Sequence, residues 1–263
     1  EISCSLVGSE MCIRDRLYST PVQTKDFTFD LNINLSRNVS KVKELADGVD
    51  YLFFNGDANF PINVGTRVGH RLGEIYAKNL YKRDENGNMI VNKQGRPTKV
   101  SGEDAFQYTL DHPIGNIEPD LLMSVSPSFT YKGFTLSALF DMKFGGDIVS
   151  VSEAMATSTG LAARTANRGN AENGWKIVAP GVTADGTVNS TAMNAQRYYT
   201  SMSGMAEEFV YDASFIKLKE LSLGYSFPKS ILKKTPLTSL NVAFVARNLA
   251  CLLYTSDAAD DRI

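Results

Sequence analysis

Residues 121–144, LLMSVSPSFTYKGFTLSALFDMKF, contain two runs in which apolar and polar side chains alternate. The apolar set of the first run is Leu121, Met123, Val125, Pro127, Phe129 and Tyr131. The alternation restarts after Lys132 and Gly133, and the apolar set of the second run is Phe134, Leu136, Ala138, Phe140, Met142 and Phe144. Two alternating runs separated by two residues that include glycine predict a β-hairpin with strands at 121–131 and 134–144.

The length and the polar face of this hairpin favour a strand pair that crosses a bilayer. Each arm has about ten residues or slightly more, which is long for a soluble strand but fits a tilted membrane-crossing strand. Small polar residues on the opposite face, such as Ser124, Ser126 and Thr130, suit the wall of a water-filled lumen. A hairpin of a soluble β-sandwich is the alternative on these residues alone.

The composition argues against a helical membrane protein but is compatible with a transmembrane β-barrel. The chain has 263 residues, of which 43% are hydrophobic and 21% are charged, as in an ordinary globular domain. Transmembrane barrels share this composition because their strands alternate. No apolar run approaches the roughly 20 residues of a spanning helix, so the sequence is not that of a helical membrane protein.

Both ends of the chain match a translated sequencing adapter. Residues 11–15, MCIRD, correspond to ATG-TGT-ATA-AGA-GAC of the mosaic end used in transposase-based libraries. The complementary strand, TGT-CTC-TTA-TAC-ACA-TCT, gives residues 251–256, CLLYTS, and its continuation GAC-GCT-GCC-GAC gives residues 257–260. We therefore expect residues 1–16 and 251–263 to be adapter-derived artefacts, and residues 17–250 to be an open-ended part of a longer protein.

Setting these ends aside changes the cysteine and charge arguments. All three cysteines (Cys4, Cys12 and Cys251) lie in them, so cysteine usage says nothing about the redox compartment. The ends also hold six of the 29 acidic and three of the 27 basic residues, which leaves 23 against 24 and a net charge near +1. A near-neutral chain without a basic cluster gives no reason to expect a nucleic-acid partner.

Three further segments show strand patterns, at 26–36, 209–227 and 240–250. Within 209–227 the apolar parity changes between Leu218 and Leu221, which predicts a β-bulge near Lys219 and Glu220. Residues 147–207 predict a long loop.

Shorter features lie between these strands. Residues 150–168 are rich in alanine and predict a helix with a break near Gly160. Residues 73–100 predict small strands or hairpins, and residues 229–234 a single helical turn. Acidic and amide residues at 84–88 could suggest a calcium loop, but the 12-residue EF-hand pattern is absent, so we predict a solvated turn.

The connections between the strands alternate in length. The turn at 132–133 and the connector at 228–239 are short, whereas 147–207 is very long. Transmembrane barrels place short turns in the periplasm and long loops outside. The predicted fold class is therefore all-β, a fragment of a large antiparallel transmembrane β-barrel that is incomplete and unclosed, with long extracellular loops.

The sequence holds no catalytic constellation, and we predict a protein that is not an enzyme. His70 and His112 lie in predicted loops without a nucleophile motif, so no catalytic, cofactor-binding or metal site is assigned to them. Trp175, Tyr198 and Tyr199 are the aromatic residues of the long loop, and they are candidates for contact with a ligand or with a protein lid. Packing of the loop against itself is the alternative. The aromatic residues expected to face lipid or its interface are Phe134, Phe140, Phe144, Tyr225 and Phe227.

Several stretches resemble one family. Residues 131–150, YKGFTLSALFDMKFGGDIVS, are similar to the "YKGF-L---F---FGGD" stretch of the SusC/RagA-type TonB-linked (TonB-dependent) outer-membrane transporters. Residues 114–120, IGNIEPD, resemble the approach to that strand, and residues 212–228, DASFIKLKELSLGYSFP, resemble a later strand of the family. Residues 247–249, RNL, resemble a late motif.

The resemblance implies a part of a plugged barrel of about 22 strands. It implies a nutrient-uptake transporter in the outer membrane of a Gram-negative bacterium, importing oligosaccharides or peptides. The implied partners are a SusD-like surface lipoprotein, outer-membrane lipid, the glycan or peptide substrate, and TonB, which would act through an N-terminal region absent here. No cofactor is implied.

Two functions of other classes remain as alternatives. A secreted β-sandwich carbohydrate-binding module would group its aromatic residues on a platform, whereas here they are spread along apolar faces. An outer-membrane enzyme, such as a barrel protease or lipase, would need Asp, His or Ser residues that converge at the external rim, and His112 alone does not make that case.

Overall fold

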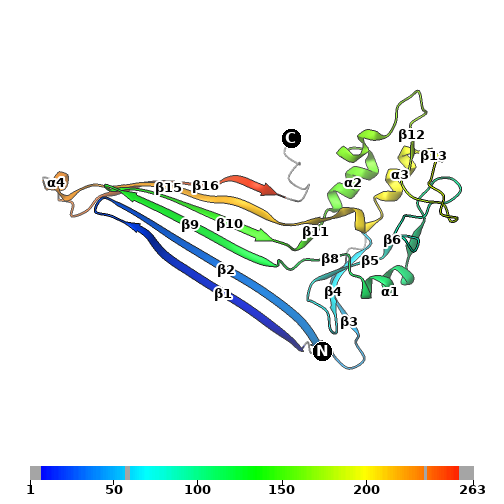
Figure 1. Ribbon diagram of the computed structural model, residues 1–263, viewed down its shortest axis with the longest axis horizontal. Coiled ribbons are helices and arrows are strands. Elements are labelled where there is room, and N and C mark those ends of the chain that lie inside the picture. Colours follow the sequence, from blue (N-terminus) through cyan, green and yellow to red (C-terminus); the bar gives the residue numbers. More distant parts are fainter. Residues whose placement is uncertain (1–6, 57–59, 234–235, 255–263) are drawn as a thin grey trace.

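The protein is described by a computed structural model that covers residues 7–56, 60–233 and 236–254. It consists of a long, twisted β-sheet with a compact subdomain at one end (Figure 1). Residues 1–6 and 255–263, which belong to the expected adapter-derived ends, lie outside the described residues.

The long sheet is a six-stranded antiparallel meander in the order β1-β2-β9-β10-β15-β16. Its strands are β1 (Val7–Gln23), β2 (Phe27–Glu44), β9 (Leu121–Tyr131), β10 (Phe134–Phe144), β15 (Phe215–Ser226) and β16 (Asn241–Tyr254). β1 and β16 are the two edges of this sheet, and within the described residues neither edge pairs with a further strand. The sheet is therefore open, as expected of an unclosed barrel fragment.

The two strands of the hairpin occupy the residues that the alternating pattern indicates, while the other strands differ. β2 continues to Glu44, beyond the expected 26–36. β15 begins at Phe215 rather than near 209, because the preceding segment Val210–Asp212 leaves the long sheet and forms β14, which pairs with β11 (Asp147–Val149). β1 was not predicted, and its residues up to Arg16 belong to the expected adapter-derived end.

The predicted bulge in β15 is confirmed at Lys219. Leu139 of β10 is opposite Glu220, but the next residue, Phe140, is opposite Leu218, so Lys219 is the extra residue. This insertion brings Leu218 onto the same face as Leu221 although their sequence parity differs. The apolar face of the sheet therefore stays continuous across the change of parity.

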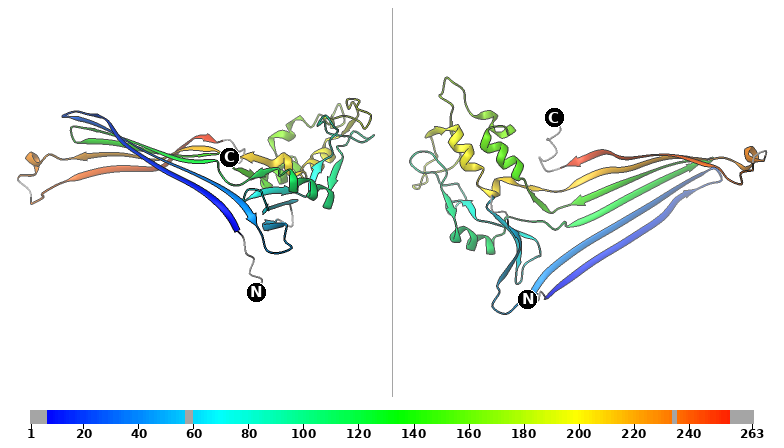
Figure 2. Two further views of the ribbon diagram at one scale, coloured as in Figure 1. Left: turned by 60° about the horizontal axis from the view of Figure 1, so that its bottom comes forward. Right: turned by 180° about the vertical axis from the view of Figure 1, so that it is seen from behind.

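The two ends of the long sheet differ in the length of the connections between the strands. The turns after β1, β9 and β15 are short and lie at one end (Figure 1). The connections from β2 to β9 and from β10 to β15 are long, and both lie at the other end, where they form the subdomain (Figures 1 and 2). The short connector after β15 holds α4 (Lys229–Leu232), the predicted helical turn.

The first long connection folds into short strands and one helix. A four-stranded sheet has the order β3-β4-β5-β8, and a separate pair joins β6 to β7. The elements are β3 (Tyr51–Gly56), β4 (Ile62–Arg67), β5 (Glu74–Ala77), β6 (Asn79–Tyr81), β7 (Lys99–Ser101), α1 (Glu103–Asp111) and β8 (Gly115–Asn116). The small strands predicted within 73–100 are confirmed, and Asp84 forms a local turn in which its Oδ1 accepts the N–H groups of Asn86 and Asn88.

The second long connection, predicted as a long loop over 147–207, does connect two strands of the long sheet, but it holds more secondary structure than the one predicted helix. Its elements are β11, α2 (Val151–Thr159), η1 (Ala163–Asn167), β12 (Lys176–Val178), β13 (Ala192–Asn194), α3 (Ala195–Met202), η2 (Ala206–Phe209) and β14. The predicted helix with a break near Gly160 is confirmed, because α2 ends at Gly160 in a left-handed cap with φ 79°. At its start Ser150 accepts the N–H of Glu153 as an N-cap.

The subdomain has a hydrophobic core to which both long connections contribute. The first connection supplies Phe60, Ala77 and Leu80. The second supplies Ala154, Ala179, Met193, Ala195, Tyr198, Tyr199, Met202, Ala206 and Phe209. The two connections therefore bury their apolar side chains in one shared core. Among the described residues, no helix is long and apolar enough to span a membrane.

Candidate functional site

The register of the long sheet gives it one apolar and one polar face. Across β2, β9 and β10 the residues Leu35, Met123 and Met142 are neighbours in one row, and Phe29, Phe129 and Leu136 are neighbours in another. The next rows along the strands are polar. An example is Asn34, Ser124 and Asp141. Most of these cross-strand rows are either apolar or polar throughout, so the alternation read in single strands extends across much of the sheet.

The polar face carries exposed hydrogen bonds and ion pairs. Asn34 donates to Ser124 at 3.0 Å, and Lys219 lies 3.2 Å from the carboxylate of Asp141. Arg247 donates to Glu220 at 2.9 Å with most of its side chain exposed. Exposed pairs of this kind add little stability. This face is therefore suited to contact with water.

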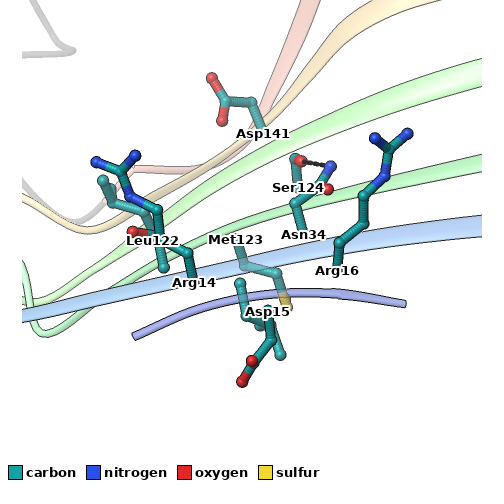
Figure 3. Close-up of a pocket in the computed structure, with 10 residues that line it drawn as sticks. Arg14, Asp15, Arg16, Asn34, Leu122, Met123, Ser124 and Asp141 are labelled. Atoms are coloured by element: carbon teal, nitrogen blue, oxygen red, sulfur yellow. Dashed lines mark hydrogen bonds between the residues drawn. The ribbon is translucent and has the colours of Figure 1, made fainter. Parts of the chain in front are cut away.

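A shallow cavity of about 440 Å³ lies on this wall. Figure 3 shows residues that line it. Arg14, Arg16, Ser124 and Asp141 lie on one side of the sheet, and Met123 lies on the other (Figure 3). Three of its lining residues, Arg14, Asp15 and Arg16, belong to the expected adapter-derived end. The cavity therefore carries no functional argument.

Aromatic residues gather on the apolar face near the short turns. Phe29 and Phe129 are cross-strand partners whose rings stack at 4.7 Å and 8°. Phe134 and Tyr225 form a second cross-strand pair at 4.4 Å, and Tyr225 contacts Phe227 at 4.8 Å. Aromatic girdles at the edges of the apolar band are typical of transmembrane barrels.

Three segments far apart in the sequence meet where the long sheet joins the subdomain. The Asn116 N–H donates to Asp147 Oδ2 at 2.8 Å, and the Gly145 N–H donates to Ser214 Oγ at 2.8 Å. The Ala213 N–H donates to the Gly146 carbonyl at 2.8 Å. We call this arrangement the junction, made of residues 114–120, 144–147 and 212–214. It fixes the subdomain to the ends of β10 and β15.

Arg164 connects four elements inside the subdomain. Its guanidinium donates to the Tyr211 hydroxyl at 2.6 Å and lies 3.3 Å from Glu153 and 3.6 Å from Glu208. It also packs over the ring of Phe209, 5.0 Å from the centroid. Burial raises the pKa of the Glu208 carboxyl, an effect that the Arg164 charge opposes and that Glu207 reinforces.

The three predicted contact residues differ in burial and in surroundings. Trp175 is 48% exposed, and it lines a cavity of about 720 Å³ together with Tyr199. Tyr199 is otherwise buried, and its hydroxyl donates to the Arg164 carbonyl at 3.0 Å. Tyr198 is buried in the core against Tyr199, and burial raises the pKa of its hydroxyl to about 12. For Tyr198 the structure therefore supports packing of the connection against itself, which was the alternative to contact with a ligand or lid.

The two histidines lie in loops, as predicted. His70 is not free in solvent, because its Nδ1 lies 3.0 Å from Glu74 Oε2, whereas the ring of His112 packs on Tyr108. Within the described residues no group of three His, Cys, Asp or Glu side chains is placed to hold a metal ion.

Comparison with known proteins points to one class of receptor. No family model matches the chain. TonB-dependent receptor P3 of Formosa agariphila is 26% identical over 255 residues, which cover 92% of this chain and 24% of the relative. TonB-dependent receptor SusC of Bacteroides thetaiotaomicron is 29% identical over 222 residues, which cover 79% of this chain and 19% of the relative. The chain is related to the SusC/RagA-type TonB-dependent receptors.

Solved structures of this type share the fold. The RagAB peptide importer in its closed-closed state matches 94% of this chain with a TM-score of 0.62 and 17% identity, and it is matched over 26% of its own chain. The structure of the RagAB peptide transporter matches 93% with a TM-score of 0.59. The chain thus spans about a quarter of the length of the SusC/RagA-type receptors that it matches.

The junction is built from the segments that carry the resemblance to SusC/RagA-type receptors. Residues 114–120, the GGD of 145–147 and the DAS of 212–214 come together there. Sequence reasoning found these segments as motifs but not their contact, because nothing in a single sequence pairs them. Arg164 was missed entirely, since a lone arginine in a polar stretch gives no signal.

Proposed function

We propose that this chain forms part of the barrel wall and outer rim of a TonB-dependent transporter in the outer membrane of a Gram-negative bacterium. The transporter would import oligosaccharides or peptides together with a SusD-like lipoprotein, driven by TonB. The observation that carries the proposal is the continuous apolar face of the six-stranded sheet opposite a polar face. The expectation that the chain is not an enzyme agrees with relatives that are named receptors.

The dimensions of the sheet support a membrane position. Phe134 and Phe144 lie at the two ends of β10, about 33 Å apart along an extended strand. At the tilt usual for barrels this corresponds to an apolar band of about 25 Å, which matches outer-membrane proteins. The subdomain would then lie at the outer surface, because long connections of such barrels face outside.

The partners are supported by the type of relative. One solved structure that shares the fold is the RagAB peptide importer, and one sequence relative is the TonB-dependent receptor SusC. We propose that the subdomain offers a contact surface to a SusD-like lipoprotein, and that TonB acts on a part of the receptor outside this chain.

We also propose that residues 17–250 are the receptor-derived part and that residues 1–16 and 251–263 are translated adapter. The register supports this, because Asp15 lies opposite Leu35 in the apolar row that continues to Met123. Figure 3 shows Asp15 on the same side of the sheet as Met123. An acidic side chain on a lipid-facing row is unfavourable in a barrel that evolved to span a membrane.

A β-sandwich module is the competing function, and the architecture argues against it. A sandwich needs a second sheet packed over the apolar face of the first. In the described part of the chain, the smaller sheets all belong to the subdomain beyond the end of the long sheet (Figure 2).

Transfer of the urea-unfolded chain into detergent micelles tests the proposal. We expect a β-type circular dichroism spectrum in micelles, and aggregation in detergent-free buffer because the apolar face then has no cover. A soluble, monodisperse protein without detergent would overturn the membrane assignment. Sequencing the parent locus across Arg16 and Cys251 tests the adapter assignment, which fails if the genomic reading frame encodes both ends.

A further inference from the structure

One strand of the wall carries cations on the face that is otherwise apolar. On β2 this face holds every second residue, namely Phe27, Phe29, Leu31, Ile33 and Leu35. Beyond Ser36, the last residue that pairs with β9, the strand runs on towards the subdomain (Figure 1). Arg37, Val39 and Lys41 follow on the same face, and Lys43 is the extra residue of a β-bulge against β1. We call Arg37, Lys41 and Lys43 the basic row.

The basic row begins at the outer edge of the apolar band. Ser36 lies opposite Leu122 of β9, and Leu121 lies opposite Phe144, the last residue of β10, so Arg37 is level with Phe144. Lys41 lies further out, by about 13 Å along an extended strand. At the tilt usual for barrels this is about 9 Å along the membrane normal. That height corresponds to the headgroup layer just outside the hydrocarbon.

The subdomain holds this end of β2 from the opposite face. Val42 is 1% exposed, and its N–H donates to the His70 carbonyl at 3.0 Å. The hydroxyl of Ser40, which is also buried, donates to Glu118 Oε2 at 2.7 Å. These contacts do not involve β1, whose outer residues belong to the expected adapter-derived end. Because side chains alternate between the faces of a strand, this burial leaves the basic row exposed on the lipid-facing side.

The cations of the basic row have no carboxylate partner. Within the described residues none of the three forms an ion pair. In the first long connection, by contrast, Arg67 pairs with Asp111 and Arg71 pairs with Asp120. Residues 37–44 hold three basic residues and one acidic residue, Glu44, which gives a net charge of +2. The basic row is therefore available to an anionic ligand.

The surroundings of the basic row favour a lipid over a free anion. The row lies on an open strand face, which offers no enclosure to a small phosphate compound. Directly below it, the apolar residues of the same face would contact acyl chains. A molecule that joins phosphate groups to acyl chains therefore matches both parts of the face, whereas a free phosphate matches only the charges.

We propose that the basic row binds the phosphate groups of the phosphorylated glycolipid in the outer leaflet of the outer membrane, with its acyl chains against the apolar residues below. The inference rests on the proposed membrane position and adds the chemistry of the lipid that contacts the outer edge of the wall.

Native mass spectrometry of the chain, folded in detergent micelles and checked by circular dichroism, counts bound lipid directly. The probes are lipid A with both phosphates, the same lipid A after removal of its phosphates, and sodium pyrophosphate as the free anion. We expect saturable binding of the diphosphorylated lipid A and an affinity lower by about tenfold or more for the dephosphorylated lipid. Equal affinity for the two lipids, equal affinity for pyrophosphate, or no binding of any probe would overturn the proposal.

Two double variants separate the basic row from net charge. Lys41→Gln with Lys43→Gln should weaken binding of diphosphorylated lipid A by about fivefold per lysine, the usual contribution of a cation at an anionic lipid surface. Lys82→Gln with Lys99→Gln removes the same charge from exposed positions of the subdomain and should leave the affinity unchanged. Lys41→Arg with Lys43→Arg should retain binding, because the charge is kept. Equal losses for the two glutamine pairs would show that net charge alone attracts the lipid, which contradicts the basic row.

This inference and the proposed function fail separately. A chain that inserts into micelles but binds both lipids equally contradicts the basic row and leaves the barrel wall intact. A chain that stays soluble without detergent contradicts the membrane position itself. If the isolated chain does not fold, the parent receptor extracted from outer membranes is compared with its Lys41→Gln and Lys43→Gln double variant by the same measurement. Equal amounts of bound lipid A would then overturn the basic row.

Discussion

The carboxylate of Asp147 accepts the backbone N–H of Asn116 at 2.8 Å, and this bond joins the two long connections of the protein. Asn116 ends the first connection, just before β9, and Asp147 begins the second, just after β10. The hairpin between them therefore enters and leaves the subdomain beside this bond. The bond is one of the hydrogen bonds of the junction, together with those of Gly145 and Ala213.

Removing this acceptor should loosen the subdomain. We expect Asp147→Ala to lower its free energy of unfolding by about 1–3 kcal/mol, because the Asn116 N–H loses its partner. Asp147→Asn retains an oxygen and should cost less. Urea unfolding in micelles, followed by Trp175 fluorescence, measures the loss. Asp185→Ala is the control, since Asp185 bonds only within its own turn. Equal losses for Asp147→Ala and Asp185→Ala would contradict the role of the junction.

A methyl group at Gly145 should disturb the same junction. Gly145 has φ +72°, and a Cβ there would overlap the side chain of Asp120. Gly145→Ala should therefore destabilise by more than the roughly 1 kcal/mol of left-handed strain alone. Gly87→Ala is the control that measures the backbone strain alone, because Gly87 has a φ of +82° and a Cβ there would meet nothing within 4 Å. If thermal unfolding gives Gly145→Ala and Gly87→Ala the same shift, the contact with Asp120 is unimportant.

The two faces of the wall can be compared at adjacent positions. Leu136 lies in the apolar row with Phe129 and Leu223, and Ser137 lies in the polar row with Ser128 and Ser222. In lipid vesicles Leu136→Arg should cost about 2–4 kcal/mol, whereas Ser137→Arg should be nearly neutral. Equilibrium unfolding from vesicles measures both. A larger loss at Ser137 would reverse the assignment of the faces.

Arg164 should be the most sensitive charged residue of the subdomain. Arg164→Met leaves Glu153 and Glu208 without their cation, and we expect a loss of about 2 kcal/mol or more. Arg164→Lys should restore part of it, because a point charge cannot reach all the partners. The pair of Arg83, which is more exposed than Arg164, with Glu207 gives the comparison, and Arg83→Met should cost under about 1 kcal/mol. Limited proteolysis of the subdomain would reveal the order of the variants.

The pH dependence of the subdomain should follow Glu208. Burial raises its pKa in the folded state, so the folded protein binds more protons than the unfolded chain between the two pKa values. The stabilisation is complete below the unfolded pKa and is lost as the pH rises through the raised folded pKa. Glu208→Gln should flatten this decline in a series of urea midpoints. A midpoint that rises with pH across the same range would show that the sign is wrong.

The sequence was most informative where the structure is periodic. Alternation indicated the bounds of β9 and β10, and the parity change between Leu218 and Leu221 indicated the bulge at Lys219. These features depend only on neighbours along the chain. The pattern underestimated β2 because its continuation to Glu44 is polar and pairs only with β1.

The subdomain could not be predicted in the same way. The rings of Phe60 and Phe209 are in contact, with centroids 6.2 Å apart, although the two residues lie in different connections. No periodic pattern along the sequence indicates this contact. Its strands are mostly three to six residues long, too short to show alternation. The sequence singled out Trp175 and Tyr199 by residue type, but their shared cavity depends on the fold.

The shared core of the two long connections limits how such receptors can exchange their outer surfaces. A chimera that receives residues 145–214 alone from another receptor would pack Phe60 and Leu80 against foreign side chains. Replacing residues 45–120 alone would remove the core neighbours of Phe209. Grafts that move residues 45–120 and 145–214 together keep the packing intact. We therefore expect the two long connections to be exchangeable only as a matched pair of segments, with the β9–β10 hairpin between them.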